Sequence, residues 1–353
     1  MRSGVRIAAV ETEVLEDAAN PQLLVHVITE DGARGTGETW WGVYQPDLAA
    51  GAPVRPYQAA VDHLLGPLTV GTRVETLVDI ETWWHRMIHA AYQYGDDGIV
   101  RGALSGIDIA LWDLLARHVD VSVASLLGGV AHDRVPVYAS LSWLGDFDAV
   151  VADVDRARAA GFRAVKLHES DPDLVAAVRE ATDPAVAVMV DVSARYDTAG
   201  AADLARRLAV AGLTWIEEPV FPQRDHRALT EVAQAGTTPL AAGENELSLA
   251  GLAALAATGA VETLQPEVAK IGGLTEARGV GAIARDAGCG VAPHNFSMGP
   301  SWLASWHLAA HLRETTWLEV PWLPAGQAFP GSTPMPVVEH GTVAAPTGPG
   351  LAG

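Results

Sequence analysis

Cysteine is nearly absent from this chain, and positive charge is scarce. Cys289 is the only cysteine among 353 residues, so no disulfide can form within the chain and no cysteine cluster can bind zinc. A reducing compartment fits this composition, and we expect a cytoplasmic protein. Lysine and arginine number 23 against 43 aspartates and glutamates, which gives a formal net charge of −20. We therefore expect no nucleic acid and no anionic membrane as partners.

Long apolar runs are also missing. No stretch reaches the roughly 20 residues that span a bilayer, and the segment MRSGVRIAAVETEV lacks the apolar centre of a signal peptide. Hydrophobic residues make up 49% of the chain, an ordinary share for a soluble globular protein. The length suits two domains, or one barrel with additions.

Polar side chains recur at a regular interval, each at the end of a short apolar run typical of a buried strand. The interval is roughly 25 residues, the length of one strand, one helix and two short loops. Helical patterns, with apolar residues three and four positions apart, lie between the runs. The polar residues are Lys166, His168, Asp191, Glu217, Glu218, Glu244, Glu267, His294 and Glu319, and the helical patterns cover 172–181, 201–212, 226–236, 247–259 and 274–288.

Strands and helices that alternate in this way predict a parallel sheet, and about eight such units predict a closed (β/α) barrel. We expect its first strand at residues 135–141 and its last at 316–320. The chemistry of such a barrel lies where the strands end at their carboxyl side. One charged residue there could be a structural ion pair, but a whole set in phase indicates a functional site.

The flanking segments have a different character. Residues 1–45 read as antiparallel strands, with Asp31-Gly32 as a hairpin turn, and residues 55–120 read as helices. We divide the chain into residues 1–130, a barrel at 131–320, and a tail at 321–353 that is expected to return to the N-terminal part. Asp108 and Asp113 fall on an apolar helix, where we expect buried structural contacts.

Three of the strand-end acids predict a metal site. Asp191, Glu217 and Glu244 come from neighbouring strands, and carboxylate oxygens are the ligands that Mg²⁺ prefers. Without a metal, three clustered carboxylates would repel one another. His85 and His89 could share a helix face, but no third ligand is near in the sequence, so we interpret them as a packed or solvated pair.

Candidate bases lie on both sides of these acids. Lys166 and His168 precede them, and His294 follows, with Glu267 one strand earlier to fix its tautomer. The arrangement suits removal of a proton next to a carboxylate, with the metal and a hydrogen-bond donor stabilising the enolate. We expect the metal and His168 to lower the pKa of Lys166, so that it can act as a base.

Aromatic and polar residues in two loops are candidates for contact with substrate. The loop 40–46 holds Trp40, Trp41 and Tyr44, and the loop 92–98 holds Tyr92, Asp96 and Asp97. Exposed aromatic residues often line ligand sites, although the first loop could equally pack on a neighbouring domain.

Together these motifs resemble the enolase superfamily, in its mandelate racemase/muconate lactonizing branch and within that the mandelate racemase-like group. The resemblance covers nearly the whole chain and implies an α/β fold, a (β/α)7β modified TIM barrel with an N-terminal α+β capping domain. It also implies Mg²⁺ bound by Asp191, Glu217 and Glu244, and a homo-oligomer.

The resemblance also suggests roles for further residues. The pair Lys166 and His168 matches the second-strand base motif, and His294 with Glu267 matches the His–Asp dyad. Lys270 matches a lysine that supports the metal carboxylates. Glu319 matches an acid that hydrogen-bonds the substrate carboxylate, in its protonated form.

Three positions depart from the family pattern. His168 replaces a lysine, Glu267 replaces an aspartate, and Ser193 replaces an asparagine that contacts substrate. Arg195 lies just beyond and is a candidate to reach the substrate instead. All three departures bear on substrate choice.

These observations predict an enzyme that removes the proton α to a carboxylate, and within this group the prediction is an acid-sugar (aldonate or aldarate) dehydratase that gives a 2-keto-3-deoxy acid. A cycloisomerase of a sugar-acid lactone and a racemase or epimerase of a 2-hydroxy acid remain open. Outside the group, Lys166 or Lys270 could form a Schiff base in a lyase, or the barrel could be a binding protein without activity.

Overall fold

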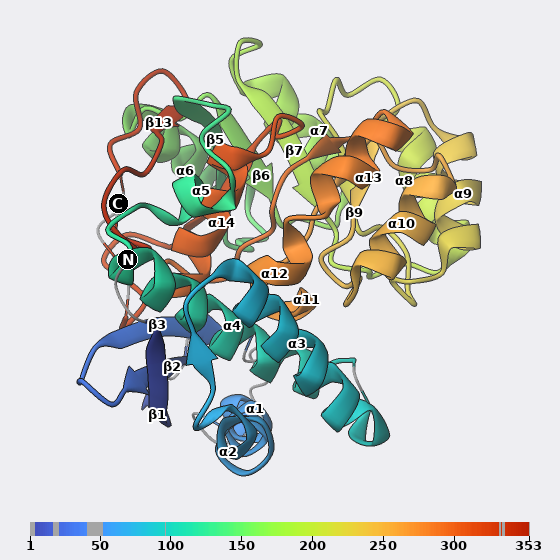
Figure 1. The fold of residues 1–353 in the computed structure, drawn as a ribbon. Helices are drawn as coiled ribbons and strands as arrows, with labels where there is room; N and C mark the ends of the chain where they lie inside the picture. The colour runs from blue at the N-terminus through green and yellow to red at the C-terminus, as the bar shows by residue number, and fades with distance from the viewer. Residues whose placement is uncertain are drawn as a thin grey trace.

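Two sheets of different kind organise the chain in the computed structural model, which describes residues 4–16, 21–40, 52–95, 97–331, 333 and 336–352. The first sheet is antiparallel and belongs to the N-terminal part. The second is parallel and curls into a barrel (Figure 1). Strands β5 to β12 make the barrel, and this confirms the predicted α/β class with its (β/α)7β barrel and N-terminal cap.

The cap sheet has the strand order β3-β2-β1-β4. Gly32 turns the chain between β2 and β3 with a φ of 83°, so the hairpin predicted at Asp31-Gly32 is confirmed. The strands are β1 (Val5–Leu15), β2 (Gln22–Thr29), β3 (Arg34–Thr39) and the short β4 (Arg73–Val74).

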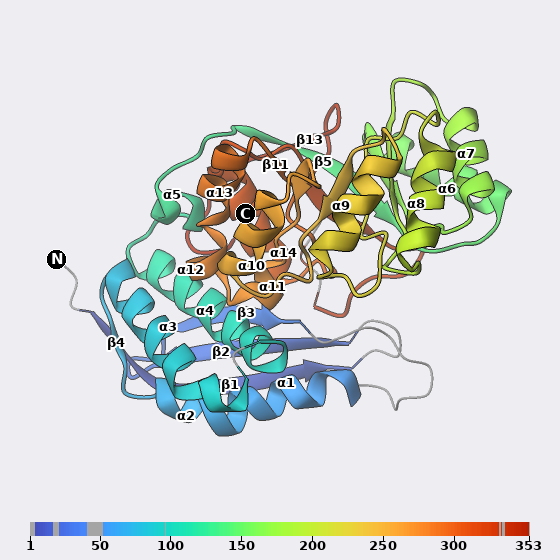
Figure 2. The same ribbon diagram turned by 90° about the vertical axis from the view of Figure 1, so that its right-hand side faces the viewer.

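Helix α4 (Ile99–His118) lies between the cap sheet and the barrel, and both views show it there (Figures 1 and 2). It is buried along most of its length because it contacts both bodies. Close approach to β3 requires glycine: a Cβ on Gly37 would lie 2.0 Å from the backbone oxygen of Gly106. The other helical elements of the cap are 3-10 turns at Ala52–Val54 and Tyr92–Tyr94, α1 (Arg55–Ala60), a π-helical turn at Val61–Leu65, α2 (Gly66–Thr69), α3 (Leu77–Ala91) and α5 (Val123–Leu127).

The barrel strands follow the chain in order around the sheet. Parallel pairing runs from β11 back to β5 and on to β12, and a parallel bridge between Val291 and Thr315 joins the two ends. The strands are β5 (Arg134–Leu141), β6 (Ala164–Leu167), β7 (Ala187–Asp191), β8 (Ile216–Glu217), β9 (Leu240–Ala242), β10 (Thr263–Leu264), β11 (Gly290–Val291) and β12 (Leu318–Trp322).

The helices between the strands cover the outside of the barrel (Figure 2). The pattern at 172–181 coincides with α7, whereas the pattern at 274–288 contains two helices separated at Arg278 and Gly279. The helices are α6 (Phe147–Ala159), α7 (Pro172–Ala181), α8 (Thr198–Leu208), α9 (His226–Ala235), α10 (Leu249–Ala257), α11 (Val268–Ile271), α12 (Leu274–Ala277), α13 (Val280–Ala287) and α14 (Pro300–His311).

The barrel interior explains why polar residues occur at the strand ends. Side chains alternate along a strand, so residues two positions apart face the same side. A buried apolar layer contains Ala164, Met189 and Trp215. Two positions further along each of these strands stand Lys166, Asp191 and Glu217. A closed apolar floor therefore lies under a polar rim.

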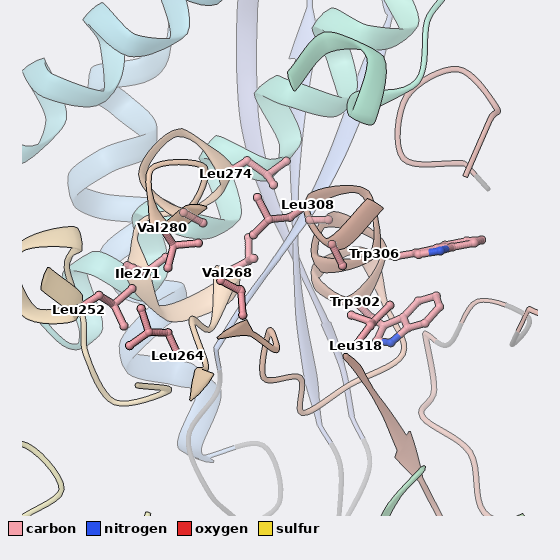
Figure 3. Close-up of a cluster of buried hydrophobic side chains, with 14 of the residues drawn as sticks. Leu252, Leu264, Val268, Ile271, Leu274, Val280, Trp302, Trp306, Leu308 and Leu318 are labelled. Atoms are coloured by element: carbon pink, nitrogen blue, oxygen red, sulfur yellow. The ribbon is translucent and has the colours of Figure 1, made fainter. Parts of the chain in front are cut away.

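One part of the main core lies beside the second half of the barrel. Side chains from α10 to α14 meet those of β10 and β12 there (Figure 3). Trp302 and Leu308 of α14 have no exposed surface. This packing fixes α14, whose N-terminus follows the loop that carries His294.

The buried carboxylates of α4 join the cap to the rest of the chain. Asp108 accepts hydrogen bonds from the backbone nitrogen and hydroxyl of Thr275, at the start of α12. Asp113 accepts from the backbone nitrogens of Thr36 and Leu351 at 3.0 and 2.8 Å. The structural contacts expected for both residues are thus present.

The tail contacts both bodies. Strand β13 (Thr342–Ala344) pairs antiparallel with β5 of the barrel, and the backbone nitrogen of Gly350 donates to the carbonyl of Val121. The division at residues 130 and 320 stays a prediction. Within the described residues, no helix is long and apolar enough to cross a membrane.

One buried histidine makes the fold sensitive to acid. His307 of α14 has no exposed surface, and its Nδ1 accepts a hydrogen bond from the backbone nitrogen of Ala124. The ring is therefore neutral, with its proton on Nε2. Burial lowers the pKa of His307 from 6.5 to about 4.

Between pH 6.5 and about 4, His307 is protonated in the unfolded chain but not in the folded chain. The free energy of unfolding therefore falls as the pH drops through this range. The amide oxygen of an asparagine at this position can still accept from Ala124. We therefore predict that His307→Asn reduces the acid-induced loss of unfolding free energy by roughly 3 kcal/mol. Chemical denaturation at several pH values measures it, and the exposed His85→Gln is the control. Equal pH slopes for His307→Asn and the unmutated protein would contradict this role.

Candidate active site

A cavity of about 330 Å³ opens at the carboxyl ends of the barrel strands. Residues of the cap and of several barrel strands line it, and most of these residues carry polar side chains. The lining residues are Trp40, His168, Asp191, Ser193, Ala194, Glu218, Gln223, Glu244, Asn245, Lys270 and His294. The volume lies at the lower end of the range for ligand pockets, which indicates a small ligand.

The three carboxylates that the sequence predicted to lie together do so: Asp191 and Glu244 line this cavity, and Glu217 is buried beside them. Asp191 ends β7, Glu217 ends β8, and Glu244 follows β9. Each offers an oxygen atom, and these atoms all lie within 4.8 Å of one another.

Glu217 is the most deeply buried of the three, with no exposed surface. Its Oε1 lies 2.6 Å from Lys166 Nζ, and its Oε2 accepts from Trp215 Nε1 and Gln265 Nε2 at 3.0 and 2.6 Å. Burial raises the pKa of Glu217 to about 7, although the charge of Lys166 opposes the shift. A buried carboxylate with this pKa gains from further positive charge nearby.

Asp191 is held ionised by its neighbours. Burial alone raises the pKa of Asp191, but the hydrogen bond from His168 and the charge of Lys166 outweigh burial and lower it to about 2. Its Oδ2 lies 3.2 Å from His168 Nε2, and its Oδ1 accepts from the backbone nitrogen of Ser193 at 2.6 Å. Ser193 thus orients the carboxylate from a left-handed backbone conformation, with a φ of 49°.

Glu244 has a comparable environment at the other end of the set. Its Oε2 lies 2.9 Å from His294 Nε2, and its Oε1 lies 3.1 Å from Lys270 Nζ. Burial raises the pKa of Glu244, but the charges of His294 and Lys270 outweigh burial and hold the pKa well below its usual range.

His294 and Glu267 form the predicted dyad. His294 Nδ1 lies 2.7 Å from Glu267 Oε2, while the other oxygen of Glu267 accepts from the backbone nitrogen of Ala269. Because carboxylates face both ring nitrogens, both nitrogens must donate, and the ring is an imidazolium as arranged. Burial alone lowers the pKa of His294, but Glu244 and Glu319 outweigh it and raise the pKa well above its usual range.

His168 resembles His294 in this respect. Its Nδ1 donates to the carbonyl oxygen of Leu141, and its Nε2 faces Asp191. Burial lowers the pKa of His168, but the hydrogen bond to Asp191 outweighs burial and raises it. The two imidazoles therefore flank the acid set, one bonded to its first member and the other to its third.

Lys166 does not occupy the position expected of a base. Its side chain has no exposed surface, and its Nζ lies 2.6 Å from Glu217 Oε1, 2.9 Å from Glu319 Oε1 and 3.7 Å from Asp191 Oδ2. Burial lowers the pKa of Lys166, but Glu217 and Glu319 outweigh it and raise the pKa well above its usual range. The charges that surround the amine here are negative, and the lowering of its pKa that we expect from a bound cation and His168 stays a prediction.

Glu319 is the second close partner of Lys166. It is buried and paired with Lys166, and its Oε2 accepts from the backbone nitrogen of Asn295 at 2.9 Å. Burial raises the pKa of Glu319, but Lys166 and His294 outweigh burial and lower it. As arranged here Glu319 is a carboxylate, and its protonated form against a substrate carboxylate stays a prediction.

Trp40 and Lys270 form the wall nearest the cap. Lys270 Nζ lies 3.9 Å from the centre of the Trp40 ring, and Trp40 meets His294 edge-on at 6.5 Å. The cation–π contact joins a cap residue to a residue that also bonds Glu244.

The remaining predicted substrate contacts have different outcomes. Ser193 lines the cavity, but Arg195 is exposed outside the lining and reaches Ser170 Oγ at 3.4 Å. Tyr44, Trp41 and Asp96 lie outside the described residues. Asp97 is paired with Arg224 at 3.0 Å on the surface.

Several residues of the site were not predicted from the sequence. Gln223 and Asn245 line the cavity, and Gln265 binds Glu217. Glu218 also lines the cavity; the sequence places it among the strand-end acids but assigns it no role. Burial raises the pKa of Glu218 to about 8, and the charge of Glu244 adds to the shift. Glu218 follows Glu217 directly, and side chains on adjacent strand residues normally face opposite sides. A left-handed φ of 43° at Glu218 breaks that rule, and the sequence gives no sign of it.

The donor set fits a divalent cation of the Mg²⁺ type. All the candidate ligand atoms of Asp191, Glu217 and Glu244 are carboxylate oxygens, and no thiolate is near. The raised pKa of Glu217 shows that the present partners leave part of its charge uncompensated.

Comparisons with known proteins give a consistent result. Residues 5–128 match the family described as mandelate racemase/muconate lactonizing enzyme, N-terminal domain, and residues 149–352 match the family described as enolase C-terminal domain-like. D-galactarolactone cycloisomerase of Agrobacterium fabrum is 32% identical over 84% of this chain and 80% of its own. D-xylonate dehydratase of Haloferax volcanii is 30% identical over 90% of this chain and 80% of its own.

Solved structures agree with these matches. A mandelate racemase/muconate lactonizing enzyme from Bordetella bronchiseptica superposes with a TM-score of 0.86 at 30% identity, over 99% of this chain and 96% of that one. The 3,6-anhydro-D-galactonate cycloisomerase of Zobellia galactanivorans gives a TM-score of 0.85 at 26% identity, over 98% and 96% of the two chains.

The acid set leads to a prediction about stability. We expect Mg²⁺ to raise the melting temperature beyond the effect of sodium chloride at the same ionic strength, because a ligand that binds only the folded state adds about 2.7 kcal/mol at a hundredfold excess over its Kd. Asp191→Asn should abolish the response, whereas Asp203→Asn, on the exposed face of α8, should keep it. Scanning calorimetry measures both, and a response that survives in Asp191→Asn would place the cation elsewhere.

Proposed function

Because the chain belongs to the mandelate racemase/muconate lactonizing enzyme family of the enolase superfamily, we propose that it dehydrates a sugar acid. The reaction removes the proton on the carbon next to the carboxylate and expels the hydroxyl of the following carbon as water. The enol that remains rearranges to a 2-keto-3-deoxy acid. Relatives named as D-xylonate and D-galactonate dehydratases support this substrate class.

The arrangement of His168 and His294 carries the proposal. Both rings line the cavity, and they bond to opposite ends of the acid set. Dehydration needs one group that takes a proton and another that gives one, at two neighbouring carbons. Two imidazoles that reach the same cavity from different sides meet this need.

We assign the roles from burial and bonding. His168 is the base, since it lines the cavity while Lys166 has no exposed surface. It takes the proton in its neutral form, which a cation at the acid set would favour by sharing the charge of Asp191 that otherwise raises the pKa of His168. His294 is the acid, because Glu267 stabilises its protonated form and orients its ring. Lys166 instead holds Glu217 and Glu319 in place through its two short ion pairs.

We further propose that Asp191, Glu217 and Glu244 hold Mg²⁺. A divalent cation bound there would withdraw electron density from the substrate carboxylate, and so make the neighbouring C–H more acidic. The chain's own groups do the rest: Trp40 closes the wall towards the cap, and Lys270 holds Glu244 through an ion pair of 3.1 Å.

Cycloisomerisation of a sugar-acid lactone is the second candidate. It uses the same proton removal, and D-galactarolactone cycloisomerase is among the similar proteins. The two reactions differ in their products, since a dehydratase gives a 2-keto acid from an open-chain substrate. A Schiff base is disfavoured, because both lysines are buried and ion-paired with carboxylates. A homo-oligomer stays a prediction.

The test is a set of acid sugars and their lactones in D₂O with Mg²⁺, followed by NMR for α-deuterium and for keto product. We expect dehydration of at least one acid sugar, and chelation by EDTA should stop it. His168→Asn should lose both α-deuterium and product, by about 10²- to 10⁴-fold. His294→Asn should lose product to a similar extent but keep α-deuterium exchange, because only the second proton transfer is removed.

The exposed His85→Gln serves as the control and should behave as the unmutated protein. Retention of α-deuterium exchange in His168→Asn would show that another group, such as Lys166, takes the proton. Turnover of lactones alone would favour the cycloisomerase, and no exchange with any acid would contradict the proposed function.

A further inference from the structure

Glu38 is a buried carboxylate of the cap that reaches into the barrel. It is the second-last residue of β3. Its side chain has no exposed surface and does not line the cavity. Its Oε1 accepts from Gln22 Nε2 at 2.7 Å. Its Oε2 accepts from Ser297 Oγ at 2.9 Å, from Ser301 Oγ at 2.7 Å and from the backbone nitrogen of Ser301 at 3.1 Å. The serines lie 259 and 263 residues further along the chain.

Glu38 caps helix α14 from another part of the chain. The first backbone nitrogens of a helix lack partners within the helix, and a carboxylate satisfies them and favours the positive end of the dipole. The N-cap residue of α14 is Gly299, which has no side chain to do this. A Cβ on Gly299 would lie 2.5 Å from Glu38 Oε2, so the glycine leaves room for the carboxylate.

The same network includes the tail. Gln22, which donates to Glu38, accepts from the backbone nitrogen of Gly331 at 2.7 Å through its own Oε1. The orientation of the Gln22 amide is therefore fixed. Burial raises the pKa of Glu38, whereas the hydrogen bonds from Gln22, Ser301 and Ser297 lower it.

Both ends of this network lead directly to the active site. Trp40 lies two residues after Glu38, and His294 lies three residues before Ser297. Between them, Phe296 meets Trp40 edge-on at 4.5 Å. Glu38 thus joins the strand that carries the Trp40 wall to the loop that carries the His294 imidazole.

We propose that Glu38 is a positioning residue, which sets His294 against Trp40 by fixing loop 294–299 and the start of α14 to the cap. The role of His294 as the acid rests on the proposed function, whereas the ordering of the loop does not. Glu38 touches no reacting atom, so its effect must pass through His294. A small displacement of a catalytic group is enough to reduce its rate strongly.

Glu38→Gln is a suitable change because it keeps the shape but not the acceptors. If the NH₂ group of the new side chain faces Ser301, it meets a backbone N–H that cannot turn away. If it faces Gln22, it meets the NH₂ group of Gln22, whose orientation is fixed because its oxygen accepts from Gly331. Either orientation leaves a buried donor against a donor.

The matched control is Asp113→Asn. Asp113 is also a buried cap carboxylate that accepts backbone hydrogen bonds across the chain, from Thr36 and Leu351, but it does not contact the His294 loop. Both variants should lose stability to a similar degree. A purely structural effect would therefore be the same in both.

The experiment measures the ratio of α-deuterium exchange to product in D₂O, with a substrate that the unmutated enzyme turns over. We expect Glu38→Gln to raise this ratio about tenfold, because the His168 step continues while the His294 step is slowed. Asp113→Asn should keep the original ratio.

Hydrogen–deuterium exchange by mass spectrometry, without substrate, supplies the second measurement. Residues 297–303 should exchange faster in Glu38→Gln and not in Asp113→Asn. Unchanged exchange there would overturn the proposal, and so would faster exchange with an unchanged product ratio. If the unmutated protein turns over no acid sugar, the proposed function fails, while the exchange comparison still decides whether Glu38 orders the loop.

Discussion

The close approach of carboxylates at the mouth of the barrel is the constraint on which the site depends. Asp191, Glu217 and Glu244 offer oxygens within 4.8 Å of one another, although like charges repel strongly where little water enters. The positive groups around them compensate only in part: Glu217 keeps a pKa of about 7. A site in this state attracts a further cation. Once a cation shares the negative charge of Asp191 and Glu244, His168 and His294, which are bonded to these carboxylates, become available for proton transfer. Metal binding and acid–base chemistry therefore arise from one electrostatic arrangement.

The fold produces this arrangement by simple geometry. Several barrel strands send an apolar side chain inward and then, two residues later, a polar one, as Met189 and Asp191 do on β7. The apolar layer closes the barrel below and keeps water out. The cap closes it above, with α4 packed between the two bodies and Trp40 over Lys270. Lys166 stands between these layers, where it acts as a counter-charge for the rim.

The sequence predicted much of this, because periodicity and residue type carry the information. The regular spacing located the strand ends, and therefore the acids, the His294–Glu267 pair and the barrel itself. The sequence could not show which way a side chain points or how deeply it is buried. Lys166 of β6 and His168, which directly follows this strand, stand two residues apart, yet burial separates a structural amine from a ring that reaches the cavity. Glu218 faces the cavity because its φ is positive, and the residues next to it in the sequence do not predict this backbone conformation. Contacts across the chain, such as that of Glu38 with Ser301, require the assembled fold.

The most direct test of the account is a crystal structure with Mn²⁺ in place of Mg²⁺, read by anomalous diffraction. The account predicts a single strong peak coordinated by oxygens of Asp191, Glu217 and Glu244 at about 2.0–2.2 Å, with His168 and His294 on either side and outside the coordination shell. A peak ligated by either imidazole, or no peak at the three carboxylates, would contradict it.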